Sequence, residues 1–111
     1  MGIAHSYLGE KYILIRLFRK TNLPKLLGGT EFTKNTLRFA WHITTVSWFC
    51  LAFILLYLAA GQFTKQVIGN VIGLTFVVHF LVALIASRGK HLSWIVFLLI
   101  SLATLYASNI S

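Results

Sequence analysis

Three long stretches without a charged side chain constrain this chain more than any other feature. They cover residues 39–60, 67–87 and 92–108, are 22, 21 and 17 residues long, and contain no Asp, Glu, Lys or Arg. A helix needs about 20 apolar residues to cross the roughly 30 Å of hydrocarbon in a bilayer. The stretches therefore predict an integral membrane protein with three clear transmembrane helices.

The composition agrees with this prediction and indicates an all-α fold. Hydrophobic residues make up 58% of the 111 residues, and charged residues make up 11%, against about 25% in soluble domains. Helices satisfy their backbone donors and acceptors internally, as a segment in lipid must. We expect one transmembrane helical domain over residues 1–111, a small bundle of four helices at about 3–20, 37–60, 66–87 and 91–108. Cys50 is the only cysteine, which excludes an internal disulfide.

The net charge of +8 is concentrated in one part of the chain. Six of the ten basic residues lie between Arg16 and Arg38. In a membrane protein such an excess marks the cytoplasmic side rather than a nucleic-acid site. The residues expected at the cytoplasmic face or on lipid headgroups are Arg16, Arg19, Lys20, Lys25, Lys34, Arg38, Arg88 and Lys90. The pattern predicts a cytoplasmic loop over residues 21–36, a C-terminus on the opposite side, and a bacterial inner membrane as the location.

The first twenty residues allow two interpretations. The segment from Ile3 to Phe18 is apolar overall, yet it contains His5, Glu10 and Lys11. It is either a basic amphipathic helix lying in the membrane interface or a short fourth membrane helix whose polar side faces protein. The second interpretation is favoured, because an interfacial helix would press Glu10 toward the acyl chains.

Two glycines in the second long stretch suggest a close helix contact. Gly69 and Gly73 have the G-x-x-x-G spacing that lets two membrane helices approach each other. The spacing fits packing within the chain as well as dimerisation, so it leaves both open.

Ionisable side chains inside membrane segments are costly and are candidates for function. If Arg16, Arg38 and Arg88 mark one boundary, a rise of 1.5 Å per residue puts His42 about 6 Å, Glu10 about 9 Å, His79 about 14 Å and His5 about 16 Å inside it. Histidine is the commonest metal ligand, and a carboxylate can orient a ligating histidine. His5, Glu10, His42 and His79 therefore form a candidate site for a transition metal or haem b.

Structural roles compete with that interpretation. His42 can anchor the chain at headgroup level, and His79 can hold a buried hydrogen bond to a neighbouring helix. Glu10 can pair with Lys11 or with a basic residue nearer the loop, and His91 is expected to be solvated. Without any Asp, and with one acid in the predicted membrane region, neither a hydrolytic triad nor a carboxylate pair can be assembled, which favours a non-enzymatic role.

Three functional hypotheses follow. The first is a small multi-pass protein that works as a homo-oligomer or as a subunit of a larger membrane complex, with intramembrane histidines in a structural or proton-handling role. The second is a metal- or haem-binding protein. The third is a small channel or transporter whose flux changes as histidine titrates. The expected partners are membrane lipids and other membrane subunits, not nucleic acid.

Overall fold

The computed structural model describes residues 1–110, and the regular elements in this range are all helical. In chain order they are α1 (Gly2–Gly9), a turn of π-helix η1 (Glu10–Leu14), α2 (Ile15–Leu17), α3 (Glu31–Ala59), α4 (Lys65–Ser87) and α5 (Ser93–Asn109). Because α1, η1 and α2 follow each other without a break, they form one helix, which we call the first helix. The predicted all-α class with four helices is confirmed.

The first helix differs from a regular α-helix at both its middle and its end. In the π turn at Glu10–Leu14, each backbone hydrogen bond spans one residue more than in an α-helix. Such turns often lie at functional sites. Beyond Leu17 the bonding tightens, because the backbone N–H of Lys20 donates to the carbonyl of Leu17. The helix predicted over 3–20 therefore ends at Leu17 and continues as a tight turn.

The helix predicted to start at residue 37 starts at Glu31 instead. No glycine or proline lies between Glu31 and Leu37 to stop it, and the acidic side chain of Glu31 suits the positive end of the helix dipole. The connection to the first helix is consequently residues 18–30 rather than the predicted 21–36. The other predicted bounds, 66–87 and 91–108, differ from α4 and α5 by one or two residues.

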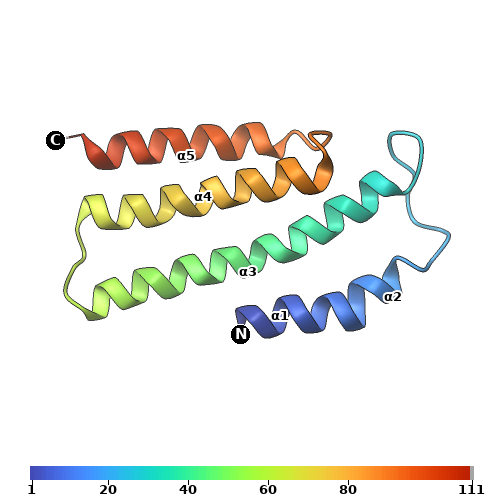
Figure 1. The fold of residues 1–111 in the computed structure, drawn as a ribbon, viewed down its shortest axis with the longest axis horizontal. Helices are drawn as coiled ribbons and strands as arrows, with labels where there is room; N and C mark the ends of the chain where they lie inside the picture. The colour runs from blue at the N-terminus through green and yellow to red at the C-terminus, as the bar shows by residue number, and fades with distance from the viewer. Residues whose placement is uncertain (111) are drawn as a thin grey trace.

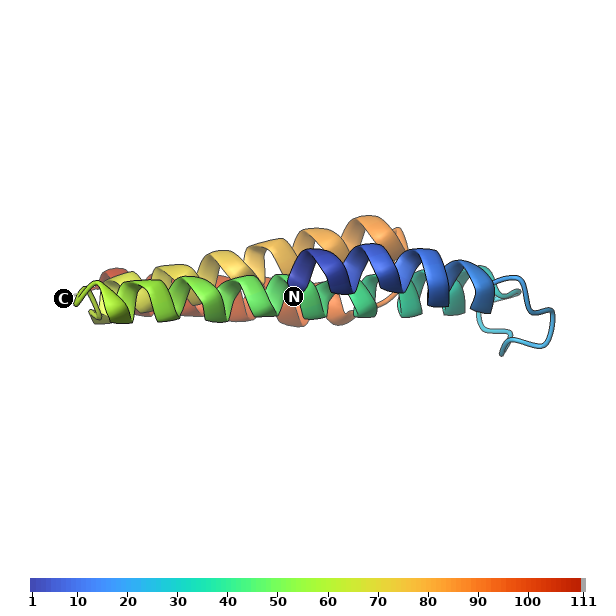
Figure 2. The same cartoon turned by 90° about the horizontal axis from the view of Figure 1, so that it is seen from below.

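The helices lie side by side in one layer, in the order first helix, α3, α4, α5 (Figure 1). The Cα atoms extend over 53 × 28 × 15 Å, and the view along the layer shows how thin it is (Figure 2). The connection 18–30 and the turn between α4 and α5 lie at one end, which we call the basic end. The C-terminus and the turn between α3 and α4 lie at the other end (Figure 1). The first helix covers only the half of α3 nearer the basic end, because Gly2 lies beside Thr45 in the middle of α3.

Small residues bring α4 and α5 close together. A Cβ atom on Gly69 would lie 1.6 Å from the hydroxyl oxygen of Ser108, and one on Gly73 would lie 2.6 Å from the side chain of Leu105. Both glycines thus pack within the chain, on the face of α4 that contacts α5.

Most apolar side chains are on the surface of the layer. Among residues 1–110, the buried hydrophobic side chains are those of Leu14, Phe39 and Ala83. By contrast, Leu55 and Leu56 on α3 and Ile85 on α4 are 62%, 65% and 72% exposed. By length and composition, α3 and α4 are able to cross a membrane, whereas α5 is a shorter apolar helix.

Candidate functional site

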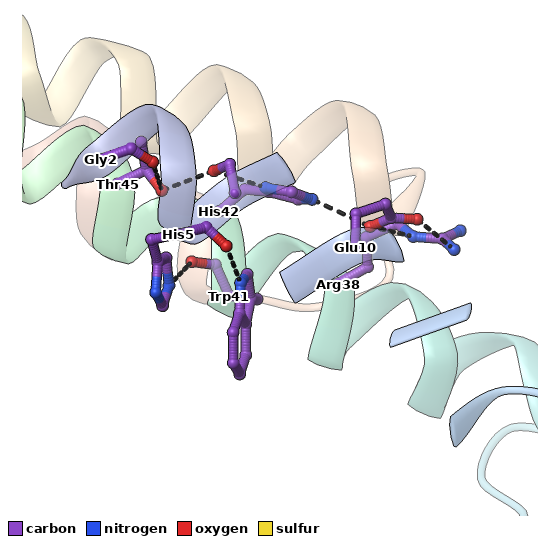
Figure 3. A network of polar contacts seen from close by, with 8 residues as sticks. Gly2, His5, Glu10, Arg38, Trp41, His42 and Thr45 are labelled. Atoms are coloured by element: carbon purple, nitrogen blue, oxygen red, sulfur yellow. Dashed lines mark hydrogen bonds and ion pairs between the residues drawn. The ribbon is translucent and has the colours of Figure 1, made fainter. Parts of the chain in front are cut away.

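A charged cluster joins the first helix to α3. Glu10 Oε1 lies 2.7 Å from a terminal nitrogen of Arg38, and Glu10 Oε2 accepts from Arg38 Nε at 3.2 Å. The same oxygen lies 3.1 Å from His42 Nε2 (Figure 3). The side chains of Glu10 and His42 are 30% and 33% exposed, so the cluster is half-buried. Of the two pairings open to Glu10, with Lys11 or with a basic residue nearer the loop, the structure shows the second, and that residue is Arg38.

Two hydroxyl groups extend this cluster toward the middle of α3. His42 Nδ1 lies 2.9 Å from Ser6 Oγ, and Ser6 Oγ contacts Thr45 Oγ1 at 2.5 Å. Thr45 Oγ1 in turn donates to the backbone carbonyl of Gly2 at 3.3 Å (Figure 3). We call the chain of Arg38, Glu10, His42, Ser6 and Thr45 the polar network. It runs along the contact between the first helix and α3, from the basic end inward.

A second contact between these helices is built around one indole. Gly9 is buried against Trp41, and a Cβ atom at residue 9 would lie 2.1 Å from the indole nitrogen. That nitrogen donates to the carbonyl of His5 at 3.1 Å. The ring of His5 stacks on Trp41 at 4.5 Å between centroids, and its Nε2 donates to the carbonyl of Trp41 at 3.3 Å. These contacts fix the register of the first helix along α3.

His79 belongs to the contact between α3 and α4 instead. It is 4% exposed. Its Nδ1 donates to the carbonyl of Thr75 at 2.8 Å, which leaves Nε2 to accept from the hydroxyl of Ser47 at 3.1 Å. Both ring nitrogens are therefore used, as expected for a buried histidine that joins two helices.

The four predicted ligands do not converge on one point. Glu10 and His42 meet, as their similar predicted depths indicated. His5 contacts Trp48 and His79 contacts Ser47, so these two histidines are level, but they lie on the first helix and on α4, which are different neighbours of α3. Within residues 1–110, no three His, Cys, Asp or Glu side chains are grouped to hold a metal ion. The site of His5, Glu10, His42 and His79 is not assembled in this structure, and the binding of metal or haem stays a prediction.

His91 is half-buried rather than fully solvated. Its ring stacks on Phe32 at 5.7 Å and meets the edge of Phe39 at 5.1 Å. Its Nδ1 contacts the hydroxyl of Ser93 at 2.8 Å. The expectation holds only in part, because the early start of α3 places Phe32 beside the turn between α4 and α5, where it covers one face of the imidazole.

The structure adds three hydroxyl residues that the sequence reasoning left out of the site. Ser6, Thr45 and Ser47 each contact a histidine or its hydrogen-bond partner. For Ser6 a signal existed, because it lies four residues before Glu10 and so shares its helix face. Ser47 had no such signal, since its role depends on which helix packs against α3.

The basic residues predicted at a headgroup surface lie along the first helix and the basic end. Arg38 reaches over the ring of Phe18 at 4.9 Å, and Arg16 lies over Tyr12 at 5.7 Å. Of the remaining predicted residues, Lys34 is half-buried. The others are exposed; these are Arg19, Lys20, Lys25, Arg88 and Lys90. Only Lys65 lies at the opposite end among the Lys and Arg residues.

No family model matches this chain, and no curated protein or solved structure is significantly similar to it. Its function is consequently argued from two properties of the molecule itself. These are the apolar surface of the helix layer and the polar network between the first helix and α3.

Proposed function

We propose that this chain is a small multi-pass membrane protein that works as a homo-oligomer or as a subunit of a larger membrane complex. The observation that supports this proposal is the exposed apolar surface of the layer. A soluble monomer rarely has a contiguous apolar patch larger than a few hundred Å², whereas large apolar side chains are exposed on residues 48–58 of α3, 74–85 of α4 and 95–106 of α5. Lipid or apolar helices of other chains are the surroundings that such a surface fits.

The distribution of charge supports an orientation. Nine of the ten basic residues lie along the first helix or near the basic end, and excess Lys and Arg remain on the cytoplasmic side of bacterial membranes. We place the basic end in the cytoplasm and the C-terminus on the other side of a bacterial inner membrane.

Membrane extraction and accessibility labelling test this part of the proposal. The chain is expected to stay in the membrane pellet after washing with alkaline carbonate and to dissolve only in detergent. In intact inverted vesicles, an impermeant amine reagent should label Lys25 and not Lys65. Release by carbonate would reject the membrane assignment, and labelling of Lys65 alone would reverse the orientation.

The shape of the layer supports assembly with other helices. Because the layer is one helix thick, each helix has two broad faces that no helix of residues 1–110 covers (Figure 2). Helix association in lipid is driven by close packing and interhelical polar contacts. Cross-linking of the tagged protein in its native membranes, followed by mass spectrometry, tests this point. A chain that remains a monomer both in native membranes and at high density in vesicles would contradict it.

The polar network supports a proton-handling role for His42. The carboxylate of Glu10 accepts a hydrogen from Nε2, so the protonation state is decided at Nδ1. In the neutral form, Nδ1 accepts from Ser6, whose oxygen accepts from Thr45. In the charged form, Nδ1 donates to Ser6, Ser6 donates to Thr45, and Thr45 donates to the carbonyl of Gly2. Rotation of two hydroxyl groups thus accommodates one added proton with every donor paired.

Nitrogen NMR of the labelled imidazoles in bilayers tests this role. His42 should carry a proton on Nε2, either alone or together with one on Nδ1, because Nε2 donates to Glu10. His79 is the internal control, because its Nδ1 donates to Thr75 and its Nε2 accepts from Ser47, so it should show the Nδ1–H form. Ser6→Ala removes the hydroxyl that Nδ1 of His42 contacts and should change the Nδ1 signal of His42 but not that of His79. A His42 proton on Nδ1 alone would contradict the pairing of Nε2 with Glu10 and, with it, the proposed role.

A further inference from the structure

A hollow with an aromatic wall lies on the other side of the contact between the first helix and α3. It has a volume of about 430 Å³, and it is lined by the rings of Tyr12, Trp41 and Trp48 and by the imidazole of His5. His5 and Trp41 point away from the polar network (Figure 3), and no side chain of that network lines the hollow. Trp48 and Tyr12 are 36% and 48% exposed, so part of each ring is free to contact a ligand.

His5 contributes an unpaired hydrogen-bond acceptor to this hollow. A carbonyl oxygen only accepts, so Nε2, which lies 3.3 Å from the carbonyl of Trp41, carries the hydrogen of the neutral ring. Nδ1 then has a free lone pair. Within residues 1–110 it has no hydrogen-bond partner, and the only side-chain nitrogen or oxygen that is both buried and unpaired there is the hydroxyl of Thr36. Nδ1 is therefore accessible from outside the chain, in contrast to His79, which uses both ring nitrogens.

The level of His5 in a bilayer makes an unpaired acceptor unfavourable. Its ring contacts Trp41 and Trp48, which follow Arg38 by three and ten residues, or about 5 and 15 Å along the helix. If Arg38 lies at the membrane boundary, as the charge-free stretch after it indicates, Nδ1 faces hydrocarbon rather than water. A polar group without a partner is disfavoured there, so the ligand that suits this hollow brings an O–H or N–H donor.

The rings around His5 narrow the class of ligand further. Aromatic rings pack against one another in offset or edge-on arrangements, so a flat ring fits this wall better than an acyl chain does. We infer that the hollow binds a membrane-soluble quinol, whose ring packs against Trp48 and Tyr12 while one of its hydroxyl groups donates to His5 Nδ1. The matching quinone has carbonyl oxygens in place of the hydroxyl groups, so it offers no donor and binds less tightly. The inference rests on the proposed membrane location.

Nitrogen NMR and native mass spectrometry of the full chain in nanodiscs test the inference. The discs are loaded either with decylubiquinol under reducing conditions or with decylubiquinone. The nitrogen signal of His5 Nδ1 should shift with the quinol and stay in place with the quinone, because only the quinol donates a hydrogen. The ring nitrogens of His79 already have partners and are the internal control. Relative to its content in the discs, the quinol should be retained about fivefold better than the quinone, which is the effect of one added hydrogen bond.

Variants test whether the quinol occupies the hollow. Ala4→Phe fills the hollow from the first helix and should abolish both the Nδ1 shift and the retention of the quinol, whereas Ala40→Phe, on the exposed surface of α3, should change neither. His5→Phe keeps a flat ring without the acceptor and should reduce the retention of the quinol to that of the quinone. If hydrogen exchange in residues 2–17 shows that this variant loosens the first helix, Trp48→Leu replaces it. That change removes one wall of the hollow and should lower the retention of both ligands.

The alternatives give different results. Equal retention of quinol and quinone, or an Nδ1 signal that neither ligand moves, would overturn the quinol site while leaving the membrane assignment intact. An Nδ1 that is already hydrogen-bonded before the quinol is added would also overturn it. Dilution of the chain in lipid then distinguishes a donor on a second copy, which is lost, from water, which is not. A chain that does not enter nanodiscs at all would instead reject the proposed function on which the inference rests.

Discussion

The first helix and the last helix are attached to the layer in different ways. Helix α5 packs closely on α4, because Gly69 and Gly73 leave room for Ser108 and Leu105. The first helix has one close contact of the same kind, between Gly9 and Trp41, but it is also attached to α3 by the half-buried ionic contacts of Glu10 with Arg38 and His42. The contact of α5 with α4 thus depends mainly on matching shapes, whereas that of the first helix also depends on charges and protons.

This difference divides the layer into a fixed part and a responsive part. Dispersion between closely packed atoms is insensitive to salt and protonation, so the pair of α4 and α5 should keep its geometry under all conditions that keep the chain folded. Half-exposed charges are screened by salt and change with protonation. The first helix is therefore the element whose attachment can vary.

The largest expected effect is on the close contact between α4 and α5. Gly69→Leu places a side chain where a Cβ atom alone would meet the Cβ of Ser108 at 2.4 Å. Overpacking of this kind lowers the free energy of unfolding by about 1–3 kcal/mol. Circular dichroism during an SDS titration of the detergent-solubilised protein measures it. Gly29→Leu is the control, because no atom lies within 4 Å of a Cβ built at residue 29. Equal stability of the two variants would contradict the close contact.

A smaller and more local effect is expected for the polar network. Glu10→Gln keeps the shape of the side chain but removes the charge that Arg38 and His42 share. We expect a loss of about 1–2 kcal/mol, between the values for exposed and buried ion pairs. Hydrogen exchange should increase in residues 2–17 and stay unchanged in α4 and α5.

Two controls sharpen this prediction. Glu31→Gln removes the same charge from an exposed position and should leave exchange in the first helix unchanged. In a double-mutant cycle, the effects of Glu10→Gln and Arg38→Gln should be less than additive, because both break one ion pair. Additive effects, or equal exchange in the Glu10 and Glu31 variants, would show that the charges do not hold the first helix.

The sequence predicted the helices. The charge-free stretches located three of them, and the segment from Ile3 to Phe18 gave the fourth. The sequence did not predict the start of α3. The change from charged to apolar residues at Arg38 indicates where a membrane would begin, but charged residues do not stop a helix, so α3 continues back to Glu31.

The sequence could not determine which helices are neighbours. The predicted depths brought Glu10 to His42 correctly, because both lie on helices that pack together. The same reasoning placed His5 level with His79, but α3 lies between the helices that carry them (Figure 1). Depth along a helix follows from residue numbers, whereas the order of helices across a layer follows from packing that one sequence does not display. The π turn at Glu10 likewise had no sequence signal.

The smallest expected effect concerns the middle contact, between α3 and α4, which combines both kinds of attachment. Ser47→Ala removes the hydroxyl that donates to His79 Nε2 and leaves a buried acceptor unpaired. Hydrogen bonds between membrane helices contribute about 0.6 kcal/mol on average and at most about 1.7, so a loss within this range is expected in the SDS titration.

Two variants are controls for this loss of stability. Ser47→Thr keeps the hydroxyl and should recover most of the lost stability, and Thr44→Ala, whose hydroxyl contacts only its own helix, should have little effect. A loss for Ser47→Ala as large as that for Gly69→Leu would mean that α3 is held to α4 mainly by this polar pair, which would place α3 with the responsive part of the layer.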